Sequence, residues 1–215
     1  MRKFPLERRF ELSTDRIEAL SDGIFAIAMT ILIFDLKVPI LHKETASATL
    51  PDALLALWPK ILGYVISFVI LGVYWVAHHL HFASIKRADR GLLWINILFL
   101  MCIGFVPFST GLMGEYIHHP LPVILYGINL IVISLVLALH WWYATRHGRL
   151  VDANIDPHLV RSVIHVIFMG PVVYLAAIAC AFINTMISIL LYALVTLIYI
   201  IPGGAHLHLK EKGRA

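Results

Sequence analysis

The chain has 215 residues, of which 60% are hydrophobic and only 14% are charged. Soluble proteins carry about 45–50% apolar and about 25% charged residues, because a surface in water needs polar cover. The composition therefore excludes an ordinary soluble domain and favours a helical membrane protein, whose apolar side chains face lipid. The formal net charge is +4, but the basic residues lie at the chain ends and between apolar segments, which argues against a nucleic-acid-binding face.

Long uncharged segments separated by short polar ones predict an all-α, polytopic membrane protein that forms one domain over residues 1–215. A hydrocarbon core of about 30 Å needs about 20 helical residues to cross it. Pro171 is expected to kink the fifth span, and Asn184 to form the turn between the fifth and the sixth. The six predicted transmembrane helices cover residues 18–36, 58–78, 92–112, 122–142, 162–183 and 185–201.

The first span has a short apolar stretch. Only 12 uncharged residues separate Asp22 from Asp35, which corresponds to about 18 Å of helix. Such a helix cannot cross lipid alone, so we expect it inside a bundle and against a cavity, with both carboxylates in water or paired within protein. The alternative is an ordinary first span whose polar ends reach the lipid headgroups.

The lysine and arginine residues predict the orientation. Fourteen of the 17 fall in the N-terminal tail, the second and fourth loops and the C-terminal tail. Only Lys37, Lys43 and Lys60 fall in the other loops. Because basic loops stay on the cytoplasmic side, we predict a multi-pass protein of the cell membrane with both termini cytoplasmic.

One face of the first span carries Gly23, Ile27, Thr30 and Phe34, which are three or four residues apart. This face is either a packing stripe, in which Thr30 donates to a carbonyl of its own helix, or a pore wall. In a pore wall, bulky apolar side chains form a constriction and Thr30 offers an oxygen to a cation. One helix cannot enclose a pore, so the second interpretation requires several copies around a symmetry axis. The spacing leaves both open.

Two blocks of the sequence resemble a known family. The first runs from Arg16 to Gly23 and is similar to the signature R-x-x-x-F-S-D-G, with Leu20 in place of the aromatic residue. The second lies within residues 74–108 and contains Y-W-V-A-H-H, D-R, L-W and P-F. Both are typical of the transmembrane protein 175 family of potassium-permeable channels, whose prokaryotic members have six helices per subunit and form tetramers. The resemblance covers residues 16–114, and beyond it only the hydropathy pattern agrees.

The resemblance implies that the first helices of four subunits line the pore. The family's apolar constriction corresponds to Ile27, with Ile31 and Phe34 as further constricting residues and Thr30 as a polar pore-lining residue. Phe34 is bulkier than the aliphatic residue expected there. The resemblance also implies a structural hydrogen-bonding cluster between the first helix and its neighbours. Its members are Arg16, Ser21, Asp22, Trp75, His78 and Asn96.

We therefore expect a homotetrameric channel that passes potassium and other monovalent cations across the bilayer, with no enzymatic activity, cofactor, metal site or nucleic-acid partner. Selectivity is expected to be modest, because the face offers neither a carbonyl ring nor a charged ring. One alternative is a small-solute or ion transporter with a cavity near Asp22 and Asp35. The other is a structural or redox subunit with haem between His78 and His140. His78 and His79 point about 100° apart on a helix, which disfavours a shared metal.

Overall fold

The computed structural model describes residues 14–42, 44, 46–148, 150–152 and 155–200. Within these residues the chain is helical, and the β-pairing in which both partners are described is one antiparallel bridge between Ile85 and Val151. The predicted all-α class is thus confirmed. The elements are α1 (Thr14–Ile31), the 3₁₀ turn η1 (Leu32–Asp35), α2 (Ala46–Leu55), α3 (Trp58–Ser84), α4 (Arg90–Gly104), α5 (Val106–Glu115), α6 (Pro120–Thr145), the 3₁₀ turn η2 (Arg146–Gly148), α7 (Pro157–Ala181) and α8 (Thr185–Ile200).

Polar residues mark the starts of several helices. The Asp89 carboxylate accepts a hydrogen bond from the backbone N–H of Leu92 at the start of α4, and Asp156 has the same role in α7. Asn184 Oδ1 accepts the N–H of Met186 at 2.8 Å in the first turn of α8. These caps satisfy N–H groups that have no acceptor within the helix. Asn184 lies in the turn between α7 and α8, as the sequence predicts.

The third predicted span consists of two helices. α4 ends at Gly104, and α5 begins at Val106 with Pro107 in its first turn. Proline has no N–H and its ring clashes with the preceding turn, so a regular helix is interrupted there. α7, by contrast, is continuous through Pro171.

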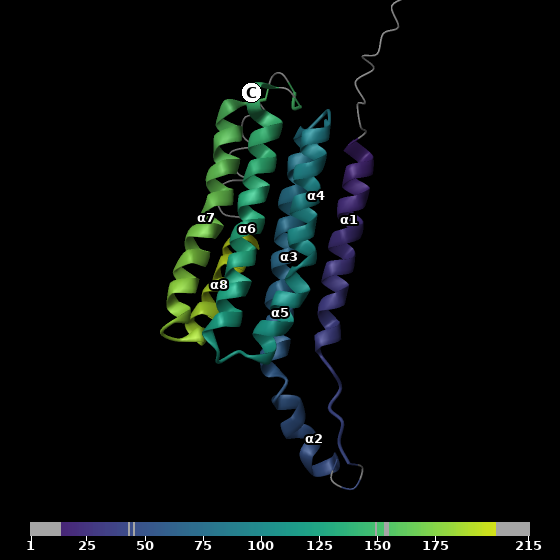
Figure 1. Ribbon diagram of the computed structural model, residues 1–215, viewed down its shortest axis with the longest axis vertical. Helices are drawn as coiled ribbons and strands as arrows, with labels where there is room; N and C mark the ends of the chain where they lie inside the picture. The colour runs from purple at the N-terminus through teal and green to yellow at the C-terminus, as the bar shows by residue number, and fades with distance from the viewer. Residues whose placement is uncertain (1–13, 43, 45, 149, 153–154, 201–215) are drawn as a thin grey trace, which may run out of the picture.

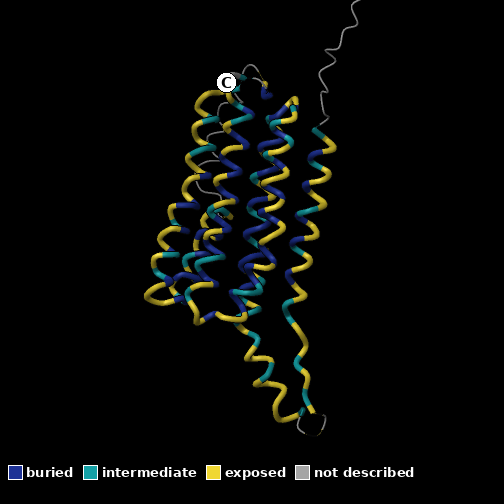
Figure 2. Tube along the Cα trace, in the orientation of Figure 1, coloured by how far each residue is buried: buried dark blue, intermediate teal, exposed yellow. Residues whose placement is uncertain are grey.

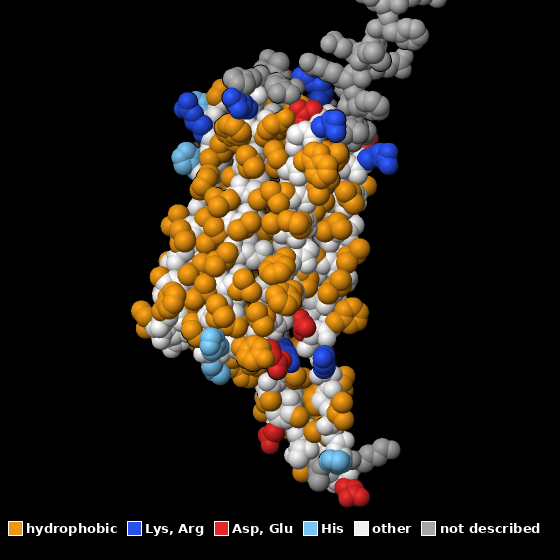
Figure 3. All heavy atoms as spheres, in the orientation of Figure 1, with side chains coloured by type: hydrophobic (Ala, Val, Ile, Leu, Met, Phe, Trp, Pro, Cys, Tyr) orange, Lys and Arg blue, Asp and Glu red, His pale blue; other side chains and the backbone are white. Residues whose placement is uncertain are grey.

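Five helical segments of the described chain are long and apolar enough to cross a membrane. An apolar surface covers the bundle between two ends where charged side chains gather (Figure 3). The sixth predicted span corresponds to α8, whose 16 residues form a helix of about 24 Å. Because the residues after 200 lie outside the described ones, the sixth crossing stays a prediction. The five segments are Thr14–Asp35, Trp58–Ser84, Arg90–Glu115, Pro120–Thr145 and Pro157–Ala181.

The long helices lie side by side, with α6 between α7 and α4 (Figure 1). In the most apolar window of α6, 61% of residues are buried, compared with 28% in α1 and in α7. α1 packs on α3, α4 and α5 at one edge, whereas α7 and α8 lie at the opposite edge beside α6. The connection that contains α2 extends beyond the bundle, at the end where α1 finishes. Within its own chain, α1 is therefore a peripheral helix and not an interior one.

Polar side chains inside the bundle are paired across helices. Thr110 Oγ1 lies 2.7 Å from Ser67 Oγ, which lies 2.9 Å from Tyr126 Oη. The hydroxyls of Tyr74 and Ser134 are 2.8 Å apart. Buried in a membrane-spanning bundle, such groups need partners within the protein. These bonds join α3 to α5 and α6.

Candidate functional site

A hydrogen-bonded cluster attaches the first half of α1 to α3 and α4. Trp75 Nε1 donates to Asp22 Oδ1 at 2.8 Å. His78 Nε2 lies 2.8 Å from Asn96 Oδ1 and is the donor, since an amide oxygen only accepts. Asn96 Nδ2 donates in turn to Ser21 Oγ at 3.2 Å. Three helices therefore meet at one polar contact.

The chain of donors ends on the backbone of α1. Ser21 Oγ donates to the carbonyl of Ile17 at 2.8 Å. Ser21, His78 and Asn96 are all buried, so each bond replaces one that water would make. The ring of Phe25 lies 6.2 Å from that of His78, one turn further along α1. Because these contacts involve one side of α1 only, they fix the rotation of the helix about its own axis.

The structure brings together five of the six residues predicted for this cluster. Arg16 is exposed and takes part in none of the cluster's hydrogen bonds. Leu20, which replaces the family's aromatic residue, is also exposed and points away from the cluster. The role of Arg16 in the cluster thus stays a prediction.

Two further histidines lie beside the cluster inside the bundle. The ring of His140 on α6 lies 5.8 Å from that of His78 and 6.1 Å from that of His81, centroid to centroid. Both ring nitrogens of His140 and Nδ1 of His81 lack a hydrogen-bond partner among the described residues. No group of three His, Cys, Asp or Glu in the described part of the chain is arranged to hold a metal. A haem iron between His78 and His140 would compete with Asn96 for Nε2 of His78.

The opposite face of α1 is left uncovered by the rest of the chain (Figure 2). Ile27 is 55% exposed and Phe34 is 74% exposed, and Thr30 and Ile31 are exposed as well. The residues that pack on the bundle are spaced three or four positions apart on the other side of the helix. They are Ile17, Ser21, Phe25, Ala28 and Leu32. The predicted pore residues therefore do not pack within their own subunit, and a second copy, water or lipid must cover them.

The hydroxyl of Thr30 can bond its own helix and still present an oxygen to a pore. Its Oγ1 lies 2.8 Å from the carbonyl oxygen of Ala26 and 2.9 Å from that of Ile27. The proton is therefore directed to the helix backbone. A hydroxyl oxygen has two lone pairs, so the exposed side of Thr30 still offers an acceptor.

The carboxylates at the two ends of the apolar stretch restrict what can surround α1. Asp22 is exposed, and Asp35 is half-buried at the end of η1. The Asp35 carboxyl lies where a β-carbon on Gly111 would overlap it, so glycine gives it room. It lines a hollow of about 250 Å³ together with Phe108 and Glu115, but Asp22 does not line that hollow. A helix surrounded by lipid would hold both carboxylates in hydrocarbon, which is strongly unfavourable.

The fold and this helix define a polytopic α-helical membrane protein that leaves one apolar face of α1 uncovered. The chain belongs to the TMEM175 family, because the family profile described as endosomal/lysosomal potassium channel TMEM175 matches residues 16–107 and full-length relatives are similar. It is 35% identical over 188 residues to a potassium channel of Streptomyces collinus, covering 86% of this chain and 90% of that one. It is 38% identical over 179 residues to a potassium channel of Chamaesiphon minutus, covering 82% and 88%.

The fold agrees with the family. The crystal structure of a lysosomal potassium-selective channel TMEM175 homolog from Chamaesiphon minutus matches with a TM-score of 0.78 and 34% identity, over 89% of this chain and 98% of that one. The resemblance found in the sequence is thus confirmed, and the family is one of channels rather than enzymes.

Proposed function

We propose that the protein is a homotetrameric channel of the cell membrane that passes potassium and other monovalent cations passively. The observation that carries the proposal is the exposed face of α1, which lies opposite the face that the polar cluster holds against the bundle. The relatives named as potassium channels cover most of the chain and support potassium as the ion.

Four copies of α1 around a central axis enclose a path, because cyclic symmetry turns identical faces toward each other. Ile27, Ile31 and Phe34 form the constriction, where a narrow apolar ring excludes water and raises the barrier for an ion. Thr30 supplies hydroxyl oxygens between these side chains. Since the path holds no ring of carbonyls or charges, selectivity between potassium and sodium is modest.

The polar cluster positions α1 and does not contact the ion. Asp22 bonds Trp75 at the start of the apolar stretch, and the bond from Asn96 to Ser21 fixes the helix rotation. Arg16 is the proposed sixth member at the same end of α1. Both chain termini lie on the cytoplasmic side, where the basic loops lie.

The decisive experiment changes the constriction. The full-length protein is reconstituted into liposomes and potassium flux is measured with a fluorescent potassium indicator. Ile27→Asn keeps the constriction wetted and should raise the flux several-fold, since a polar side chain retains water that isoleucine excludes. Ile128→Asn on α6 is the matched control, because Ile128 is 47% exposed but lies on another helix. Unchanged or lower flux in folded Ile27→Asn protein would contradict the pore assignment.

Two further measurements separate the channel from a transporter with a cavity near Asp22 and Asp35. Flux through a channel rises with the potassium gradient without saturating, whereas flux through a carrier saturates. The mass of the detergent-solubilised protein, determined by light scattering, should correspond to four chains. A saturating flux, or a stable monomer that conducts, would favour the transporter.

A further inference from the structure

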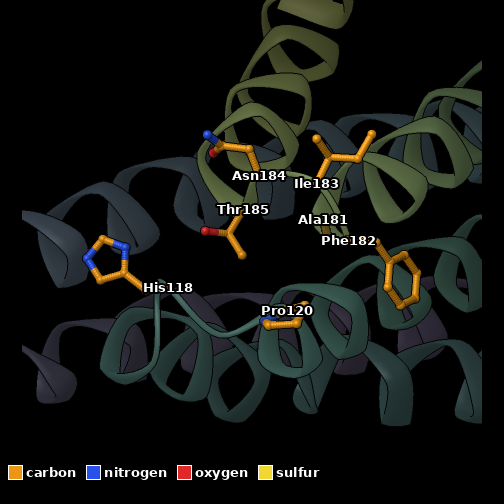
Figure 4. A pocket seen from close by; sticks show the side chains of 7 residues that line it. All are labelled: His118, Pro120, Ala181, Phe182, Ile183, Asn184 and Thr185. Carbon is orange, nitrogen blue, oxygen red and sulfur yellow. The ribbon is translucent and has the colours of Figure 1, made fainter.

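A second hollow lies at the edge of the bundle farthest from α1. It has a volume of about 310 Å³ and is formed by the loop between α5 and α6 and the turn between α7 and α8 (Figure 4). α7 and α8 lie across the bundle from α1 (Figure 1), so the hollow is separate from the proposed pore. The turn from Phe182 to Asn184 forms one wall and His118 stands on the other side.

Thr185, the first residue of α8, carries the polar group at the centre of this hollow. The residue is only 9% exposed, and its hydroxyl points into the hollow toward the side of His118 (Figure 4). The hydroxyls of Thr110 and Thr196 bond the carbonyl four residues earlier, but Thr185 makes no hydrogen bond among the described residues. The hydroxyl opens onto the hollow and is therefore free to bond a ligand that enters it.

The polar groups around the hollow favour a negatively charged ligand. The start of α8 carries the partial positive charge of a helix N-terminus. Asn184 uses its Oδ1 to cap Met186, so its amide nitrogen remains a donor. His118 offers a ring N–H from the opposite side, and no acidic residue lines the hollow. Donors gathered at a helix start are suited to phosphate oxygens.

The apolar residues beside the hollow distinguish a lipid from a free ion. Phe182 is 74% exposed and Ile183 is 86% exposed, in the turn next to the membrane-spanning surface. A free phosphate needs no apolar neighbours, whereas a phospholipid carries its phosphate directly above its acyl chains. We propose that this hollow binds the phosphodiester headgroup of a membrane phospholipid. Thr185 and His118 donate to the phosphate, and Phe182 and Ile183 contact the acyl chains.

The test measures lipid binding to the full-length protein in detergent by native mass spectrometry. The probes are dimyristoyl phosphatidylglycerol, dimyristoylglycerol with the same chains but no phosphate, and inorganic phosphate. Phosphatidylglycerol should bind more tightly than dimyristoylglycerol, and Thr185→Val should weaken it about three- to tenfold, as expected for one lost hydrogen bond. Thr185→Ser keeps the hydroxyl and should bind normally. Thr196→Val, on the same helix but bonded to its own backbone, is the matched control.

Three outcomes would overturn the proposal: equal binding of dimyristoylglycerol, undiminished binding by Thr185→Val, or inorganic phosphate that displaces phosphatidylglycerol at equal concentration. The last outcome would make the hollow a free-phosphate site. If Thr185→Val does not fold, His118→Gln takes its place and should also weaken phosphatidylglycerol binding. The inference does not depend on the proposed pore, and Thr185→Val should leave potassium flux unchanged.

Discussion

Replacing Asn96 by leucine should release α1 from the bundle. Leucine has the same number of side-chain heavy atoms and the same branching but removes two hydrogen bonds, of 2.8 Å to His78 and 3.2 Å to Ser21. Ser21 keeps its bond to its own helix, but the His78 Nε2–H is left buried without an acceptor. A buried donor without an acceptor costs about 1–3 kcal/mol, and a lost hydrogen bond about 0.5–1.5 kcal/mol. We therefore expect Asn96→Leu to lower the free energy of unfolding by about 2–4 kcal/mol.

The effect should be local to α1, which a matched variant can show. Asn129 on α6 is also buried, and its amide donates to Ser109 at 3.4 Å, at a point where α1 is not involved. Asn129→Leu removes one long hydrogen bond, so it should lower the melting temperature less. Hydrogen exchange followed by mass spectrometry should show faster exchange in α1 for Asn96→Leu only. Potassium flux in liposomes should change for Asn96→Leu and stay normal for Asn129→Leu.

The reasoning fails if α1 exchanges at the same rate in Asn96→Leu and in the unmodified protein. It also fails if Asn129→Leu accelerates α1 exchange as strongly, because the effect would then be a general loss of stability. Faster exchange in α1 with normal flux would show that the cluster stabilises the subunit without positioning the pore.

Glycine positions give a second prediction. A β-carbon on Gly127 would overlap the Tyr192 hydroxyl, so Gly127→Ala should destabilise the α6–α8 packing by about 1–3 kcal/mol, seen as a lower melting temperature. Gly72 has no atom near its β-position, and Gly72→Ala should be neutral or stabilise α3 by up to about 1 kcal/mol. The ion pair of Lys60 and Glu115, 2.6 Å between nitrogen and oxygen, is partly exposed. A double-mutant cycle with Lys60→Met and Glu115→Gln should give a coupling of about 0.2–1 kcal/mol that falls with added salt.

The contacts that attach α1 are those of the cluster that the family resemblance implies, and the need of polar side chains for partners gives them a physical reason. Ser21 and Asp22 are polar residues at the start of the apolar stretch of α1, and such residues need partners from neighbouring helices. His78 and Asn96 are polar residues in two other apolar segments, so they are natural partners. The exposed face of α1 follows from the same periodicity, but the periodicity of one chain does not encode what covers that face.

The buried histidines could not be placed from the sequence. Tyr74, His78 and His81 share one face of α3, which is a signal that polar residues gather there. Whether that face contacts His140 depends on the relative height and rotation at which α6 packs beside α3. The hydropathy pattern does not encode this arrangement. The break between α4 and α5 has a visible signal in Pro107, which the uncharged segment around it obscured.

The connection between α1 and α3 has a consequence for how the subunit is built. It is 22 residues long, 36–57, and its described residues extend away from the bundle and do not form a tight turn (Figure 1). A long connection restricts the relative placement of the two helices at its ends only weakly. The alignment of α1 with its neighbours is therefore determined by side-chain complementarity and not by chain continuity. If the chain is cut within this connection, α1 should still pack on the rest of the bundle. The two fragments should also reassociate when they are expressed together.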